Sequence, residues 1–159
     1  MNLINSSKLS DFDKLVNNKK FKKIFIITGE NSFYKSKANL LIKFSKNKTL
    51  KFFFKKSKFP ELSELYLILK EVNNFKPDII LSIGGGAVID YSKIVSIFDY
   101  RLIKDLNKKL LRYENISKKK IYPLIALPTT AGAGAEVTSN AVIYIKGIKY
   151  SVENSLLIP

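Results

Sequence analysis

Several residue types that active sites commonly use are missing from this chain of 159 residues, which contains no histidine, no cysteine and no tryptophan. Without cysteine there is no disulfide framework and no thiolate chemistry. Without histidine, the commonest metal ligand and the commonest acid–base group near neutral pH are lost. We therefore expect no catalytic and no metal-binding residue within this chain.

Arginine is also scarce, although the formal net charge is +15. Only Arg101 and Arg112 are arginines among 28 basic residues, whereas arginine is favoured for bidentate contacts to phosphates and bases. The lysines are best interpreted as solvated faces, and we expect no nucleic-acid partner. No apolar run reaches the ~18 residues of a membrane span, and the N-terminus lacks the order of a signal peptide. We therefore expect no membrane partner and a cytoplasmic location.

What the chain does contain is an alternation of apolar strand patterns with helical patterns. The strand patterns cover 23–28, 50–54, 78–83 and 123–127, and the helical patterns cover 36–46, 61–72 and 87–98. A hairpin is expected from strands 141–145 and 149–152 around Lys146, Gly147 and Ile148. This order predicts an α/β fold with a doubly wound, Rossmann-like parallel sheet, formed as one domain over residues 1–159.

Two glycine-rich segments follow successive strands of this predicted sheet. Gly84, Gly85 and Gly86 join a buried strand to a helix, and the second segment, PTTAGAGAE, spans residues 128–136. Residues without a large side chain allow backbone N–H groups and the positive end of a helix dipole to approach a pyrophosphate. The alternative is that the glycines only form tight turns. Since ligands bind beyond the carboxyl ends of such strands, both segments together indicate a phosphate-containing ligand.

The two segments also carry a family resemblance. GGGAVIDYSK (84–93) and PTTAGAGAEVT (128–138) resemble the GGGSxxDxAK and PTTAGTGSEVT elements of the iron-containing (group III) alcohol dehydrogenases. The resemblance covers nearly the whole chain and implies a dehydroquinate synthase-like N-terminal domain that binds a nicotinamide cofactor. In that family a following helical domain holds Fe²⁺ or Zn²⁺ through an aspartate and histidines. We expect this C-terminal metal-binding domain to be absent from the chain, which explains the missing histidines.

The resemblance assigns cofactor contacts to particular positions of this sequence. The glycine loop with Ala87 matches the pyrophosphate loop, and Asp90 matches an aspartate that lies toward the nicotinamide. The remaining matched contacts are Thr129, Thr130, Thr138, Asn140 and Lys149. The chain departs from the family at Ala87, Ala133, Ala135 and Phe59, each of which lacks a hydrogen-bonding group that many members have.

The end of the first predicted strand bears on the choice of cofactor. Many members have an aspartate there, which binds the adenosine ribose hydroxyls and would repel a 2′-phosphate. This chain has Gly29, with Ser32 and Lys35 nearby, and we expect both Gly29 and Ser32 to lie at the cofactor. NADP(H) is therefore favoured over NAD(H). The alternative is that Gly29 only turns the chain.

The resemblance implies an alcohol dehydrogenase or aldehyde reductase that acts on a small aldehyde or alcohol. TGENSFYKSKA (28–38) and the hairpin sequence most resemble the phosphonoacetaldehyde reductase branch, which forms 2-hydroxyethylphosphonate. Two alternatives stay open: a truncated or split-gene cofactor-binding module without activity of its own, and a relative of glycerol dehydrogenase or dehydroquinate synthase. We expect the isolated chain to be inactive, and its partner to be a second copy or a separately encoded C-terminal domain.

Overall fold

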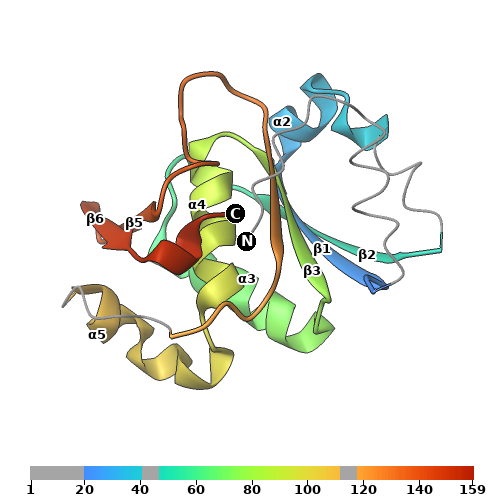
Figure 1. The fold of residues 1–159 in the computed structure, drawn as a ribbon. Helices are drawn as coiled ribbons and strands as arrows, with labels where there is room; N and C mark the ends of the chain where they lie inside the picture. Colours follow the sequence, from blue (N-terminus) through green and yellow to red (C-terminus); the bar gives the residue numbers. More distant parts are fainter. Residues whose placement is uncertain (1–19, 41–46, 112–117) are drawn as a thin grey trace.

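The computed structural model describes residues 20–40, 47–111 and 118–159. In these ranges the chain forms a four-stranded parallel sheet, a two-stranded hairpin and the helices that cover them (Figure 1). The elements, in chain order, are β1 (Lys23–Gly29), α2 (Glu30–Lys35), β2 (Thr49–Lys55), α3 (Leu62–Phe75), β3 (Ile79–Gly84), α4 (Gly86–Ile97), η2 (Tyr100–Asp105), α5 (Leu106–Leu111), β4 (Leu124–Pro128), β5 (Asn140–Ile145), β6 (Ile148–Glu153) and η3 (Ser155–Leu157). None of these helices is long and apolar enough to cross a membrane.

The parallel sheet has the strand order β2-β1-β3-β4, so the direction of winding reverses between β1 and β3. β1 is buried from Ile24 to Thr28, and all six residues of β3 are buried. Strands that are covered on both faces have such continuous apolar sequences. The expected doubly wound α/β fold is therefore confirmed.

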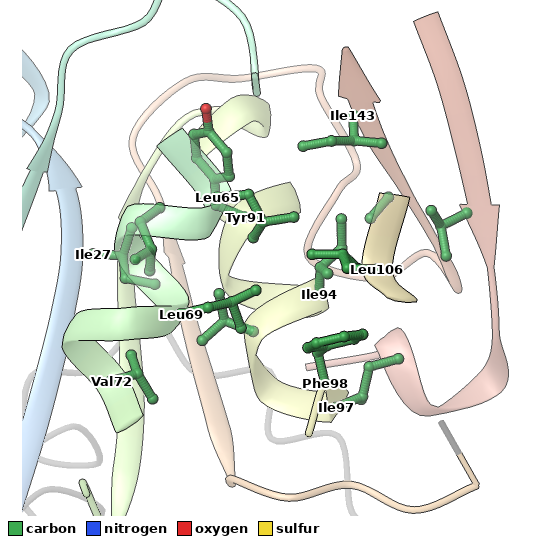
Figure 2. Packing of buried hydrophobic residues seen from close by; sticks show 14 of the residues in the cluster. Ile27, Leu65, Leu69, Val72, Tyr91, Ile94, Ile97, Phe98, Leu106 and Ile143 are labelled. Atoms are coloured by element: carbon green, nitrogen blue, oxygen red, sulfur yellow. The ribbon is translucent and has the colours of Figure 1, made fainter. Parts of the chain in front are cut away.

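Apolar side chains alternate between the two faces of the sheet and build two separate cores. Phe25 and Ile27 of β1 point toward α3 and α4, where the larger core lies (Figure 2). Ile24 and Ile26 point to the other face and pack with Phe33 of α2. Because α3 and α4 cover one face and α2 covers the other, both faces of the sheet are shielded from water.

The predicted hairpin is confirmed, and its turn is tighter than expected. β5 and β6 pair antiparallel from Asn140 opposite Glu153 to Ile145 opposite Ile148. Lys146 and Gly147 form the two-residue connection with φ values of 51° and 80°. Positive φ at both central residues is typical of the type I′ turn, whose twist matches that of the flanking strands. The hairpin lies beside α4 and buries Ile143 against it.

The helix expected over 36–46 is wrong in its position. The helix in this region is α2, which begins directly after Gly29, and Lys37 then turns the chain with a φ of 59°. Residues 38–40 form only a short 3₁₀ turn, and 41–46 lie outside the described residues. Ala38, which the periodicity placed on a helix face, is instead buried in the smaller core.

A buried hydrogen-bond network holds the loop between β2 and α3 against α4. The Tyr91 hydroxyl of α4 donates to Glu64 Oε2 at 2.9 Å, and the Glu61 amide donates to the Tyr91 oxygen at 2.5 Å. Glu64 also accepts from the amides of Lys56 and Ser57, at 2.5 Å and 3.3 Å. Burial and the Glu64 carboxylate raise the pKa of Tyr91, so its hydroxyl stays protonated and continues to donate.

Replacing Tyr91 by phenylalanine should lower the free energy of unfolding by about 2 kcal/mol, because a buried carboxylate loses a donor and a backbone amide loses its acceptor. Urea unfolding followed by circular dichroism measures this loss. Tyr34→Phe is the matched control, since Tyr34 is 59% exposed, and should change stability by less than about 0.5 kcal/mol. Equal values for the two variants would contradict a stabilising role for the network.

Candidate functional site

The carboxyl ends of β1, β3 and β4 lie side by side where the winding of the sheet reverses. The Thr28 hydroxyl at the end of β1 donates to the Ile83 carbonyl of β3 at 2.7 Å. The Thr129 amide, just beyond β4, donates to the Gly84 carbonyl at 3.0 Å. Both glycine-rich segments therefore start from adjacent strand ends, at the place where open α/β sheets bind ligands.

The first glycine-rich segment forms the start of α4, and its backbone is closely packed. Gly85 is the N-cap residue, and its carbonyl accepts from the amides of Val88 and Ile89. A Cβ at Gly84 would lie 2.6 Å from Val88 Cγ2, and one at Gly85 would lie 2.9 Å from Thr130 Oγ1. Neither position has room for a side chain. The first N–H groups of this 12-residue helix thus form a surface that an anion can approach closely.

The second glycine-rich segment needs glycine for its backbone conformation. Gly132 and Gly134 have φ values of 86° and 61°, which residues with a side chain rarely adopt. A Cβ at Gly86 would lie 3.6 Å from Ala133 Cβ, so the two glycine-rich segments are in contact. Figure 1 shows this segment, in orange, passing from β4 to β5 beside the start of α4.

Lys93 of α4 joins the far end of the second segment to the helix, and our sequence reasoning did not identify it. Its side chain is fully buried. The ammonium group donates to the Thr138 carbonyl at 2.8 Å, to Thr138 Oγ1 at 3.0 Å and to the Asn140 carbonyl at 2.9 Å. The available signal was a lysine within the apolar helix sequence VIDYSKIVSIF, because a charge in such a helix requires partners.

Asp90 lies one turn before Lys93 and is half-buried beside the hairpin. Burial raises the pKa of its carboxyl from 3.8 to about 6, whereas a backbone hydrogen bond from Val142 and the charges of Lys93 and Lys149 oppose this shift. Lys149 of β6 is exposed. The expected contacts in this region therefore lie around two residues of α4. Thr138 and Asn140 bind the Lys93 ammonium group, and Lys149 lies near Asp90, at the junction of α4, the second segment and the hairpin.

The other expected contacts lie nearer to β1. Gly29 ends β1 with a φ of −99° and a ψ of 144°, and a Cβ there would lie 3.5 Å from Ser32 Oγ. Ala87 lies in the first turn of α4, and Thr130 is exposed above Gly85. All the expected contacts thus lie along one edge of the sheet, from the end of β1 to the hairpin. Their binding roles stay predictions.

No group of three or more His, Cys, Asp or Glu side chains able to hold a metal ion occurs within residues 20–40, 47–111 and 118–159. Asp90 has two lysines as its charged neighbours. Glu136 is held near Lys93, and its Oε2 has no hydrogen-bond partner in the described part of the chain. The described residues therefore do not fit an iron or zinc centre.

Comparison with known families shows which family this chain belongs to. The sequence model of the family "Iron-containing alcohol dehydrogenase" matches residues 2–159. The chain belongs to the iron-containing alcohol dehydrogenase family. The matched range covers nearly the whole chain and includes both glycine-rich segments.

Curated relatives of this family are much longer than the chain. An alcohol dehydrogenase from Thermococcus barophilus is 37% identical over 105 residues, which are 63% of this chain and 28% of the relative. The bifunctional aldehyde-alcohol dehydrogenase of Escherichia coli K12 is 33% identical over 118 residues, which are 67% of this chain and 13% of the relative. The chain therefore spans less than a third of either protein.

Two solved structures share the fold over almost the full chain. The sulfoacetaldehyde reductase from Bifidobacterium kashiwanohense, solved in complex with NAD+, gives a TM-score of 0.82 with 22% identity, and the match covers 98% of this chain and 41% of that one. The iron-containing alcohol dehydrogenase from Thermococcus thioreducens gives a TM-score of 0.77 with 25% identity, and the match covers 98% and 42%.

The raised pKa of Asp90 makes stability depend on pH. The folded carboxyl keeps its proton up to about pH 6, whereas the unfolded one loses it near 3.8, so the free energy of unfolding falls as the pH rises between these values. Asp90→Asn should remove this fall, which is on the order of 2 kcal/mol. Urea unfolding at pH 4, 5, 6 and 7 measures it.

Asp99→Asn is the control for this measurement, because hydrogen bonds from Arg101 lower the pKa of Asp99. A lowered pKa gives the opposite sign: stability from Asp99 is present above the unfolded pKa and is lost as the pH falls. An Asp90→Asn variant with the same pH dependence as the original chain would show that Asp90 is not buried as described.

Proposed function

We propose that residues 1–159 are the cofactor-binding N-terminal domain of a nicotinamide-dependent alcohol dehydrogenase or aldehyde reductase. The observation that carries this proposal is the pair of contacting glycine-rich segments at the reversal of the sheet, where Gly84 and Gly85 have no room for a Cβ. Membership of the iron-containing alcohol dehydrogenase family supports it. A dinucleotide bound at this edge would supply or accept the hydride.

The residues of this chain bind and orient the cofactor in this proposal. The backbone amides at the start of α4 bind the pyrophosphate, with the helix dipole favouring its negative charge. The Thr130 hydroxyl, next to Gly85, is placed to donate to the same phosphates. Asp90 and Lys149 flank the far end of the site, where the nicotinamide would lie.

We assign the metal of the family to residues outside the described part of this chain. The described residues include no metal-ligand group, so no chemical step is derived for a metal here. A helical metal-binding domain, fused or separately encoded, is the proposed partner, and without it residues 1–159 should bind cofactor but reduce no aldehyde. A homo-oligomer is the alternative assembly.

NADP(H) is the cofactor that the end of β1 favours. Gly29 offers no carboxylate to the adenosine ribose. The Ser32 hydroxyl lies beside Gly29, and Lys35 is exposed at the end of α2. A carboxylate at this position would repel a 2′-phosphate, and a hydroxyl and a cation would attract it. The Ser32 hydroxyl and the Lys35 ammonium group support the proposed preference for NADP(H), whereas the Glu30 carboxylate in the first turn of α2 opposes it.

For the complete enzyme we propose a short aldehyde that carries an anionic group, with phosphonoacetaldehyde as the first candidate. The sequence TGENSFYKSKA and the hairpin sequence favour this branch. A cofactor-binding module without activity of its own is the second candidate, favoured by the absence of a metal-ligand group in the described residues. Assays of phosphonoacetaldehyde reduction by the chain, with and without a helical metal domain, distinguish the two.

The glycine cradle can be tested by Gly85→Val. The new side chain would meet Thr130 and cover the helix N-terminus, so the dissociation constant for NADPH should rise at least tenfold, about 1.4 kcal/mol. NADPH fluorescence titration measures it. Leu67→Val, an exposed change on α3, is the control and should bind NADPH as the original chain does. A folded Gly85→Val chain with unchanged affinity would disprove the proposed site.

Cofactor preference can be tested by Gly29→Asp. The backbone at Gly29 suits any residue, and its Cβ would make only an ordinary contact with Ser32, so the fold should tolerate the carboxylate. The ratio of the NADP(H) and NAD(H) dissociation constants should shift toward NAD(H) by about tenfold or more. Isothermal titration calorimetry measures both constants.

Asn74→Asp is the matched control for this charge change. Asn74 is exposed in the last turn of α3, and the substitution adds the same carboxylate away from the end of β1. The cofactor ratio of this variant should equal that of the original chain. A Gly29→Asp variant with an equally unchanged ratio would show that the end of β1 does not contact the adenosine ribose.

A further inference from the structure

The buried ammonium group of Lys93 is saturated by acceptors from one short segment. A lysine ammonium has three N–H donors, and all three are used: two on Thr138 and one on the Asn140 carbonyl. Two of these acceptors are backbone carbonyls, and the third is the Thr138 hydroxyl oxygen. The bonds connect α4 to residues 45 and 47 positions later in the chain.

Among the described residues, few backbone hydrogen bonds hold the segment between β4 and β5. Between β4 and β5 the backbone bonds are those of Thr129 to the Gly84 carbonyl at one end and of Asn154 to the Ser139 carbonyl at the other, with one internal bond from Val137 to Gly134. Gly132 and Gly134 in between add conformational freedom. Lys93 therefore supplies the side-chain hydrogen bonds that connect Thr138 to α4, whereas Asn140 is also held by its pairing with Glu153 in the hairpin, which packs against α4.

Charged groups from every neighbouring element surround this ammonium group. The carboxylates of Asp90 on α4 and of Glu136 on the second segment favour its charge, whereas burial disfavours it. Burial lowers the pKa of Lys120, before β4, to about 8, and the nearby charge of Lys93 adds to this shift. Lys120 donates to the Ile158 carbonyl at 2.6 Å. Lys149 on β6 and the Val142 amide on β5 act on Asp90 from the other side.

We propose that Lys93 is a positioning residue of the cofactor site, which fixes Thr138 and Asn140 beside Asp90 so that the nicotinamide half of a dinucleotide finds a preformed surface. An apolar side chain would cost less to bury in this helix than a charge does. The lysine side chain instead connects α4 to Thr138 and Asn140 through three hydrogen bonds. The inference rests on the proposed function for the identity of the ligand, but not for the connection itself.

The first test compares Lys93→Met with Lys70→Met, a matched change at an exposed position of α3. In the free chain, hydrogen–deuterium exchange of residues 137–141 should become at least about tenfold faster in Lys93→Met and stay unchanged in Lys70→Met, because only the first variant removes the bonds that close this segment. Unchanged exchange in a folded Lys93→Met chain would overturn the inference. If that variant does not fold, Lys93→Leu, which also has no donor, takes its place in the same comparison.

The second test separates the two halves of the cofactor. Lys93→Met should bind NADPH at least about tenfold more weakly than the original chain, whereas 2′,5′-ADP, which lacks the nicotinamide, should bind within about twofold. Equal weakening for both ligands would indicate a general loss of structure and overturn the positioning role. Failure of the original chain to bind either ligand would refute the proposed function instead, and the exchange experiment would still decide whether Lys93 holds the segment.

A third test measures the pKa of the Asp90 carboxyl in Lys93→Met. A general loosening of the structure would expose this carboxyl and lower its pKa, whereas loss of the Lys93 charge should raise it. Removing the nearby cation should raise the pKa of Asp90 further, as measured by ¹³C NMR of its carboxyl group. An unchanged or lower pKa would contradict the described arrangement.

Because the chain has no cysteine, Lys93→Cys can also be alkylated selectively with bromoethylamine in the unfolded state and refolded. The resulting side chain again ends in an ammonium group and should restore slow exchange and NADPH affinity, relative to the original chain refolded in parallel.

Discussion

The pairing of β1 with β3 fixes where every segment of the candidate site begins. Their register sets Thr28 opposite Ile83, and the Thr28 hydroxyl bonds the Ile83 carbonyl. Since the winding of the sheet reverses at this pair, the helices that follow β1 and β3 cover opposite faces. Open α/β sheets bind ligands beyond such a pair of strand ends, and Gly29 and Gly84 are the last residues of β1 and β3 there.

Three sets of hydrogen bonds connect the sheet and α4 to the surrounding loops. Thr129 bonds the end of β3, Tyr91 holds the loop before α3, and Lys93 holds the segment before β5. Tyr91 and Lys93 both come from α4, two residues apart. α4 therefore supplies the N-terminal amides of the candidate site and also positions the loops on either side of it, so its own burial against the larger core stabilises the whole edge.

The sequence was sufficient to predict the sheet and the two glycine-rich segments at its strand ends, because both depend on local patterns. Continuous apolar runs such as Ile79–Gly84 indicate buried strands, and glycines at their ends indicate close backbone approach. The helix expected over 36–46 is wrong at residues 36–40, because apolar spacing alone does not show where a helix begins, and the chain turns at Lys37 with a φ of 59°. Lys93 was overlooked because 28 basic residues conceal one buried lysine, and its acceptors lie more than 40 positions away.

In the proposed site, the pyrophosphate would contact mainly backbone groups, with the Thr130 hydroxyl beside them, and this explains which departures from the family pattern are tolerable. Ala87, Ala133 and Ala135 each lack a hydroxyl that many members have, a loss of about 0.5–1.5 kcal/mol where a hydrogen bond was made. None of them changes the helix N-terminus or the left-handed turns at Gly132 and Gly134. The geometry therefore survives substitutions that weaken affinity, whereas a Cβ at Gly85 would displace the Thr130 side chain beside the helix N-terminus.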